Sequence, residues 1–139
     1  MKLKNRTIVF FLCGFFNFWI YTSVNAIELK AEISSETISF DDSVILTLIL
    51  SGNQANLPSP DIGSITDFEA WGRGQSQQMS ISNGEVKSES IFKYELKPQK
   101  TGSLTIPALS VTVDGVTYSS KPINVIVTES ATILTPPSD

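Results

Sequence analysis

Apolar residues recur at every second position along most of the chain after residue 26. In the first such stretch, residues 27–33, they alternate with Glu and Lys, and in residues 44–50 Val or Leu stands at each even position. Successive side chains of a strand point to opposite faces, so this period of two predicts strands with one buried face. Ile45 and Ile49 add apolar residues to the other face of the second stretch, which indicates a strand covered on both sides or one whose outer face meets a partner.

Two dipeptides predict tight hairpin turns. Asn83-Gly84 and Asp114-Gly115 each stand between two alternating stretches. Both central residues of a type I′ turn need positive φ, which Asn, Asp and Gly tolerate better than other residues. We therefore expect a long hairpin around residue 83 and a second one around residue 114, with Tyr118 to Val127 forming the last strand.

Other turn and loop signals separate the remaining stretches. Asp41-Asp42 marks a turn, where Asp is favoured for its hydrogen bonds to its own backbone. Between residues 52 and 66, Pro58 and Pro60 fix φ and remove backbone donors, which predicts a crossing loop. About seven to nine short strands and no convincing helix between residues 27 and 129 predict an all-β fold, an antiparallel β-sandwich.

The first 26 residues have the pattern of a secretory signal peptide. Three basic residues precede an apolar run from residue 8 to residue 20, and a small-residue site ends at Ala26. We expect a signal-peptide helix that is cleaved after Ala26. The alternative is an uncleaved signal anchor, because residues 7–24 are nearly long enough to span a bilayer. Cys13 lies in the middle of the apolar run, which disfavours lipid attachment.

The net charge and the missing residue types argue against several classes of function. After residue 26 the chain keeps seven of its ten Lys and Arg but all 14 Asp and Glu, a net charge of −7, which gives no electrostatic case for nucleic acid. It has no His and no Cys there, and so lacks a thiol nucleophile, an imidazole base and an ordinary zinc set. We predict no catalytic residue, no metal site and no cofactor.

Interleaved charges mark the stretch around residues 85–100. Because basic and acidic residues alternate there, we interpret them as cross-strand ion pairs on a solvated face and not as a basic binding patch. The residues concerned are Lys87, Lys93, Lys97 and Lys100 with Glu85, Glu89 and Glu95.

The segment "WGRGQ" holds the candidate contact residues, Trp71, Arg73 and Gln75. Trp and Arg are enriched at interface hot spots, and flanking glycines let a backbone approach a partner closely. The competing interpretation is that Trp71 packs in or over the sandwich while the two glycines form a bulge. The polar strand that follows, residues 75–82, is an ordinary solvent-facing strand or an edge open to strand addition.

Several phrases in the chain resemble the first domain of the BatD family, the oxygen-tolerance or aerotolerance proteins. They are Leu57-Pro58, Asp67-Phe68-Glu69, Gln75 to Ser82, Tyr94 to Pro98, Gly102 to Pro107 and Asp114 to Pro122. The resemblance implies an immunoglobulin-like sandwich facing the periplasm. It also implies work with membrane-anchored von Willebrand A-domain proteins and a MoxR-type ATPase in stress tolerance or envelope assembly.

We therefore expect three parts: a signal peptide (1–26), a sandwich domain (27–129) and a Pro-rich tail or truncated linker (130–139). The expected function is a non-enzymatic, exported protein-binding or scaffold domain, periplasmic and associated with the inner membrane through a partner or an uncleaved signal segment. Relatives continue to further β-domains and a transmembrane helix, so a truncated fragment without a role of its own is one alternative.

The other alternative is a carbohydrate-binding accessory module, which needs several exposed aromatic side chains in a row. The aromatic residues after residue 26 fall mostly on positions predicted to face inward, which disfavours this reading. They are Phe40, Phe68, Trp71, Phe92, Tyr94 and Tyr118.

Overall fold

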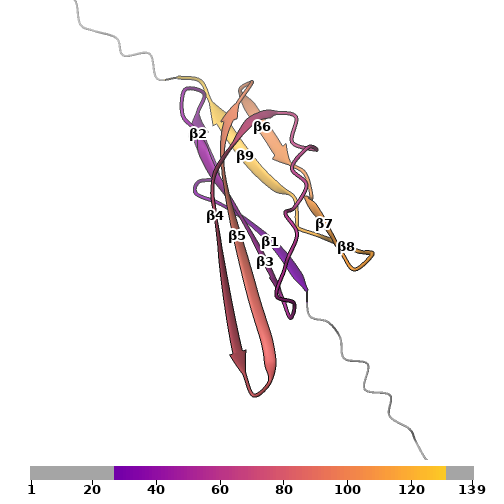
Figure 1. Ribbon diagram of the computed structural model, residues 1–139. Coiled ribbons are helices and arrows are strands. Elements are labelled where there is room, and N and C mark those ends of the chain that lie inside the picture. Colours follow the sequence, from indigo (N-terminus) through magenta and orange to yellow (C-terminus); the bar gives the residue numbers. More distant parts are fainter. Residues whose placement is uncertain (1–26, 131–139) are drawn as a thin grey trace, which may run out of the picture.

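The computed structural model describes residues 27–130, and these residues contain nine strands and no helix (Figure 1). The strands are β1 (Glu28–Ile33), β2 (Thr37–Ser39), β3 (Val44–Gly52), β4 (Phe68–Ser82), β5 (Glu85–Pro98), β6 (Gly102–Ile106), β7 (Ser110–Val113), β8 (Val116–Ser119) and β9 (Ile123–Thr128). Accordingly, nothing within this range is a helix that could cross a membrane. The predicted signal helix, its cleavage after Ala26 and the tail from residue 131 lie outside the described residues.

Two sheets form the layers of an immunoglobulin-like sandwich. One has the strand order β1-β3-β5-β4 and the other β2-β9-β6, while β7 and β8 form a separate hairpin. All pairs are antiparallel except β2 with β9, which is parallel. The predicted antiparallel β-sandwich is therefore confirmed, with this short parallel pair as the one exception among the described strands. The alternation of a three-residue strand predicts its buried face but not its partner's direction.

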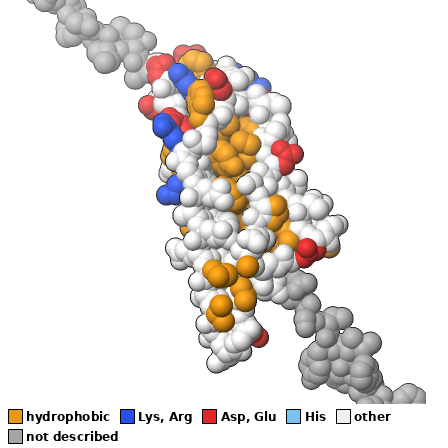
Figure 2. Space-filling view, in the orientation of Figure 1, with side chains coloured by type: hydrophobic (Ala, Val, Ile, Leu, Met, Phe, Trp, Pro, Cys, Tyr) orange, Lys and Arg blue, Asp and Glu red, His pale blue; other side chains and the backbone are white. Residues whose placement is uncertain are grey.

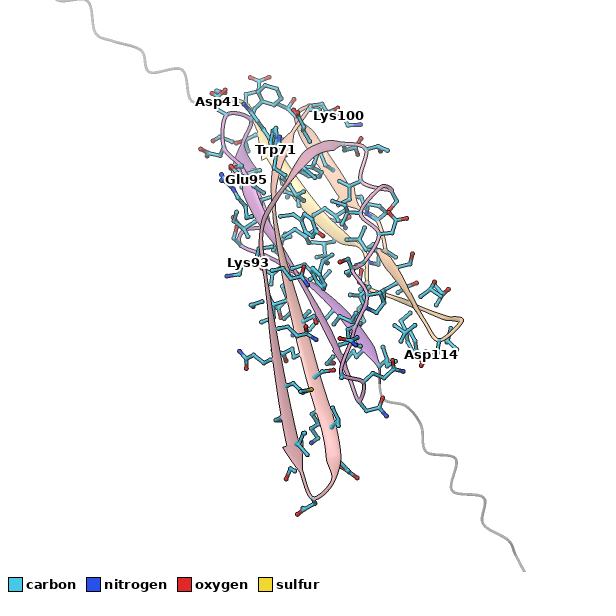
Figure 3. All side chains as sticks on the ribbon, in the orientation of Figure 1. Asp41, Trp71, Lys93, Glu95, Lys100 and Asp114 are labelled. Atoms are coloured by element: carbon cyan, nitrogen blue, oxygen red, sulfur yellow. The ribbon has the colours of Figure 1, made fainter. Side chains whose placement is uncertain are left out.

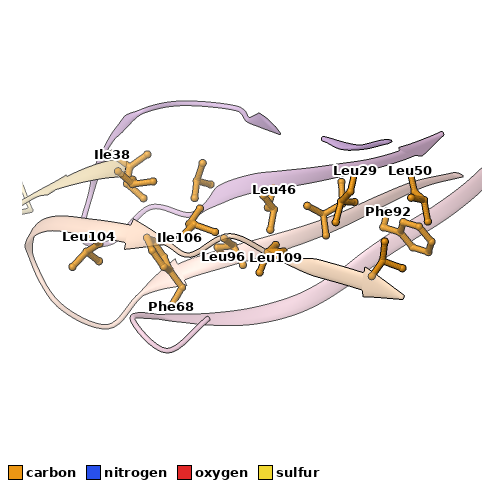
Figure 4. Close-up of a cluster of buried hydrophobic side chains, with 14 of the residues drawn as sticks. Leu29, Ile38, Leu46, Leu50, Phe68, Phe92, Leu96, Leu104, Ile106 and Leu109 are labelled. Atoms are coloured by element: carbon orange, nitrogen blue, oxygen red, sulfur yellow. The ribbon is translucent and has the colours of Figure 1, made fainter. Parts of the chain in front are cut away.

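The alternating residues fill the space between the two sheets. Val44, Leu46, Leu48 and Leu50 of β3 are fully buried, whereas the odd positions between them are partly exposed. They belong to one cluster with side chains of β6 and β9 from the opposite layer (Figure 4). Burying this apolar surface is the main stabilising contribution to the fold, because the described residues include no Cys and so no disulfide.

Both predicted hairpin turns are confirmed. Asn83 and Gly84 have φ of 52° and 78°, and Asp114 and Gly115 have φ of 50° and 78°. These are the positive values that a two-residue type I′ connection requires.

The last predicted strand is two strands, which corrects the expectation for residues 118–127. Tyr118 lies in β8, and β9 begins only at Ile123. Between them Ser120 turns into the core, where its N–H donates to the carbonyl of Leu109 at 2.8 Å and its Oγ accepts from the N–H of Leu109 at 3.0 Å. Pro122 then lacks the donor that a continuous ladder would need.

The β4–β5 hairpin is the longest element and extends beyond the sandwich (Figure 1). The third strand, β3, ends where Gly52 pairs with Ser88, and Ser88 pairs on its other side with Met79. We call the hairpin from this last shared row to its turn, residues 79–88, the arm. The crossing loop predicted for residues 52–66 is found at residues 53–67, between β3 and β4, and it makes one isolated β-bridge, from Asp61 to Ser110.

Candidate functional site on the β4–β5 hairpin

A β-bulge at Arg73 divides β4 into two segments. Gly72 pairs with Tyr94 and Gly74 pairs with the adjacent Lys93, so Arg73 is an extra residue without a partner position on β5. Gly74 has a φ of +149°, a conformation that residues with a side chain rarely adopt. The interpretation of the two glycines as a bulge is confirmed. One extra residue also exchanges the faces to which all later side chains of the strand point.

Before the bulge, Trp71 lies on the outer face of the four-stranded sheet. It stands opposite Glu95, and Glu95 stands opposite Ile45 on β3. Directly opposite residues share a face, so all three face away from the second sheet. Trp71 is 44% exposed and is not a member of the core cluster.

The outer face carries further apolar residues farther along the sheet from Trp71. Ile49 of β3 stands opposite Ile91 of β5, and both are partly exposed, as Ile45 is. We call this surface the outer patch, defined as Ile45, Ile49, Trp71, Arg73, Ile91 and Glu95. No described strand forms a second layer over Ile45 and Ile49, so the first reading, a strand covered on both sides, is not supported within residues 27–130. Contact of this face with a partner stays a prediction.

Glu95 fixes the position of Arg73 on the outer patch. Its Oε2 forms an ion pair with Arg73 Nη2, and its Oε1 accepts a hydrogen bond from Ser43 Oγ at 2.6 Å. Figure 3 shows Trp71 and Glu95 on adjacent strands in the part of the hairpin that belongs to the sandwich. The hydrogen bonds from Ser43 and Arg73, together with the charge of Arg73, hold the pKa of Glu95 below its usual range. The Glu95 carboxylate is therefore charged at neutral pH.

After the bulge the odd-numbered residues of β4 face the inner side. Gln75 stands opposite Phe92, which is buried in the core. The three predicted contact residues are therefore not on one surface: Trp71 and Arg73 share the outer patch, while Gln75 lies on the other face. The sequence contains no signal for this separation, because "GRGQS" has no apolar residue from which the alternation could be followed.

The arm exposes two large apolar side chains that sequence reasoning did not identify as a surface. Met79 stands opposite Ser88 and Ile81 opposite Val86, and the two are 56% and 67% exposed. Met79 and Ile81 lie on the same face of the hairpin as Phe92, which is buried in the core. Figure 2 shows hydrophobic side chains gathered on the projecting end of the molecule.

The loop after β3 is hydrogen-bonded to the hairpin where the arm begins. Ser88 Oγ donates to the carbonyl of Gln54 and, at 3.3 Å, to that of Gly52, while Gln77 Nε2 donates to the carbonyl of Ala55 at 2.8 Å. An open groove of about 880 Å³ lies beside the arm where β3 ends, with Met79 among its lining residues. The second layer of the sandwich therefore does not reach Met79 and Ile81.

The predicted ion pairs along β5 are largely wrong. Within residues 27–130 the ion pairs are Lys30–Glu32 at 2.5 Å, Lys100–Asp67 at 2.8 Å, and Arg73–Glu95. Lys87 and Lys93 take no part, because their cross-strand neighbours include Ser80 and Thr47, which carry no charge.

Aromatic side chains other than Trp71 lie in or against the core over the described range. Phe68 and Phe92 are buried, and Phe40, Tyr94 and Tyr118 pack on the core cluster. Burial raises the pKa of Tyr94. The same range holds no group of three or more His, Cys, Asp or Glu side chains placed to bind a metal ion.

Residues 31–127 match the family model described as the BatD DUF11 like domain. No curated protein and no solved structure matches the chain significantly. The matched range includes residues from all nine strands, so it covers both sheets, the outer patch and the arm.

Proposed function

Because the chain belongs to the BatD family, we propose that it is a non-enzymatic protein-binding domain that contacts another envelope protein through its outer patch. Its partners would be von Willebrand A-domain membrane proteins, working with a MoxR-type ATPase in aerotolerance and envelope stress. The proposal includes export to the periplasm, where the domain would be associated with the inner membrane through these partners.

The observation that carries the proposal is the exposure of Trp71 beside Arg73 on a regular sheet. Trp and Arg dominate interface hot spots, because a large flat apolar surface or a planar guanidinium buries much area at low entropic cost. Trp71 stands on a paired strand, and Arg73 is positioned by Glu95. Little ordering would then be required on binding, which favours affinity.

The composition of the patch suits a protein partner. Glu95 stands between Trp71 and Ile45 and is paired with Arg73, while the partly exposed Ile49 and Ile91 lie farther along the same face. Aromatic residues and Arg are enriched in protein interfaces, where apolar and polar side chains occur together. A sugar-binding face would need a row of exposed aromatic rings, whereas Trp71 is the one aromatic side chain among the exposed large hydrophobic residues described.

The non-enzymatic part of the proposal rests on the residue inventory. Residues 27–139 contain neither His nor Cys. The most strongly hydrogen-bonded carboxylate of the site, Glu95, is engaged by Ser43 and Arg73 and has a lowered pKa, which suits a fixed negative charge and not a general base near neutral pH.

Site-specific photo-crosslinking in cells tests this proposal. The full chain would carry a photoreactive amino acid at position 71, and a matched chain would carry it at Ile126, which is similarly exposed but lies on β9 of the other sheet. We expect position 71 to yield an adduct with a von Willebrand A-domain protein and position 126 to yield none. No adduct from position 71, or the same adducts from both positions, would overturn the proposal.

A further inference from the structure

The outer edge of β4 has no partner among the described strands. In the sheet order β1-β3-β5-β4 it is the last strand, and it is 15 residues long. Among residues 27–130, the backbone hydrogen bonds outside the sheet ladders do not involve residues 74–82 either. A row of backbone donors and acceptors along this edge is therefore available to another strand.

Edge strands normally carry features that prevent such pairing, and this segment lacks them. Charged residues, prolines, bulges and short length are the usual devices. The opposite edge strand, β1, has Lys30 and Glu32, and β6 has only five residues. In β4 the bulge and Arg73 protect the first segment, whereas residues 74–82, "GQSQQMSIS", contain no charge and no proline.

We propose that a second copy of this chain pairs with this edge, antiparallel, across a two-fold axis that passes through Ser80. Closed two-fold dimers present the same surface from both copies. Such pairing brings no like charges together, because the paired segment is uncharged in both copies, although the chain as a whole is acidic. A foreign strand would need its own complementarity, whereas this segment is complementary to itself.

The exposed apolar residues select the register. With Ser80 on the axis, Met79 of each copy stands opposite Ile81 of the other, and the four side chains lie together on the inner face. If the axis passed through Gln78, Met79 would face Gln77 and Ile81 would face Gln75. If it passed through Met79, Ile81 would face Gln77. The Ser80 register alone pairs each exposed apolar residue with the other, as favoured across antiparallel strands.

This pairing leaves the outer patch accessible. It uses residues 78–82, beyond the bulge, whereas Trp71 and Arg73 lie before it. The dimer and the partner contact at Trp71 are therefore independent, and the failure of one does not imply the failure of the other.

Disulfide trapping in the full chain tests the register. Cys13 is the one cysteine of the sequence, so a Cys13→Ser background leaves each engineered cysteine alone. In the proposed dimer the two copies of residue 80 are direct neighbours, within the Cα separation that a disulfide allows. The two copies of residue 82 are offset by four residues, about 13 Å along the strand, and those of residue 76 by about 26 Å.

We expect Ser80→Cys to form a covalent dimer under mild oxidation, at least tenfold faster than Ser76→Cys and Ser82→Cys. Sedimentation equilibrium of the unmodified chain should show a monomer–dimer equilibrium, and Ile81→Lys, which places a charge on an already exposed position, should abolish it. A monomer at all concentrations, equal trapping at the three serine positions, or coupling of Ser80→Cys to a different protein in preference to its own copy would overturn the proposal.

Discussion

Arg73, the extra residue of the β4 bulge, is held by an ion pair with Glu95 on the neighbouring strand, and Glu95 also accepts a hydrogen bond from Ser43, which directly precedes β3. These contacts join β4, β5 and the residue before β3 at the point where β4 changes face. The ion pair keeps Arg73 beside Trp71 on the outer patch. The bulge itself turns Met79 and Ile81 to the inner side, so one inserted residue determines both surfaces of the hairpin.

The ion pair makes stability depend on pH in a defined direction. The folded-state pKa of Glu95 lies below the ordinary value of 4.5. A lowered folded pKa contributes stability that is fully present above the unfolded pKa and is lost as pH falls through the folded value. Replacing Glu95 by Gln should therefore reduce the free energy of unfolding at pH 7, and the difference from wild type should shrink below about pH 4.5.

Urea unfolding followed by tryptophan fluorescence between pH 7 and pH 2.5 measures this difference. Glu69→Gln is the matched control, because Glu69 is an exposed glutamate on β4 that forms no ion pair within residues 27–130. A Glu95→Gln effect that stays constant, or that grows toward acid pH, would contradict the role of the ion pair.

The bulge can be tested at its two glycines. Gly74 has positive φ and Gly72 does not, while an added Cβ would meet no atom within 4 Å at either position. Gly74→Ala should cost about 1–3 kcal/mol because of backbone strain alone. Gly72→Ala should change stability by about 0.5 kcal/mol or less. Equal effects of the two substitutions in thermal or chemical unfolding would mean that the bulge does not exist in solution.

Two buried serines on the same face of β5 provide another matched pair. Ser88 Oγ anchors the loop after β3 at the Gln54 carbonyl, whereas Ser90 Oγ is buried without a hydrogen-bond partner among the described residues. Ser88→Ala should cost about 1 kcal/mol and increase amide hydrogen exchange in residues 53–57. Ser90→Ala should be neutral or slightly stabilising, since it removes an unsatisfied hydroxyl. The reverse order would show that the loop is not attached through Ser88.

The assignment of faces in β3 predicts unequal costs for neighbouring residues. Leu48 is fully buried between the sheets, and Ile49 lies partly exposed on the outer patch. Leu48→Ala should cost about 2–5 kcal/mol, and Ile49→Ala clearly less. If Ile49→Ala were as costly, the outer face would be covered in the folded protein.

Alternation and turn chemistry were sufficient to predict most of the sandwich. The buried even positions of β3 and the Asn83-Gly84 and Asp114-Gly115 turns are found as predicted. A buried face selects apolar residues and a turn with φ > 0 selects Asn, Asp or Gly, so both can be predicted from residue type. Trp71 and Arg73 were likewise identified from the sequence as neighbours on a candidate contact surface, which the structure brings together on one face.

Features that depend on distant parts of the chain could not be predicted from local residue types. The separation of Gln75 from Trp71 depends on one inserted residue in a stretch without apolar residues. The exposure of Met79 and Ile81 depends on where β3 and its loop end, which is a property of a different strand. The parallel direction of β2 beside β9 likewise depends on tertiary packing, because three residues cannot specify a partner.

The most direct test of the central claim is the affinity of the full chain for the purified soluble domain of a von Willebrand A-domain partner, measured for wild type, Trp71→Ala and the control Ile126→Ala. We predict that Trp71→Ala weakens binding by about tenfold or more while remaining folded, as expected for a hot-spot aromatic residue, and that Ile126→Ala binds like wild type. Wild-type affinity in folded Trp71→Ala, or equal losses in both variants, would contradict a contact through the outer patch.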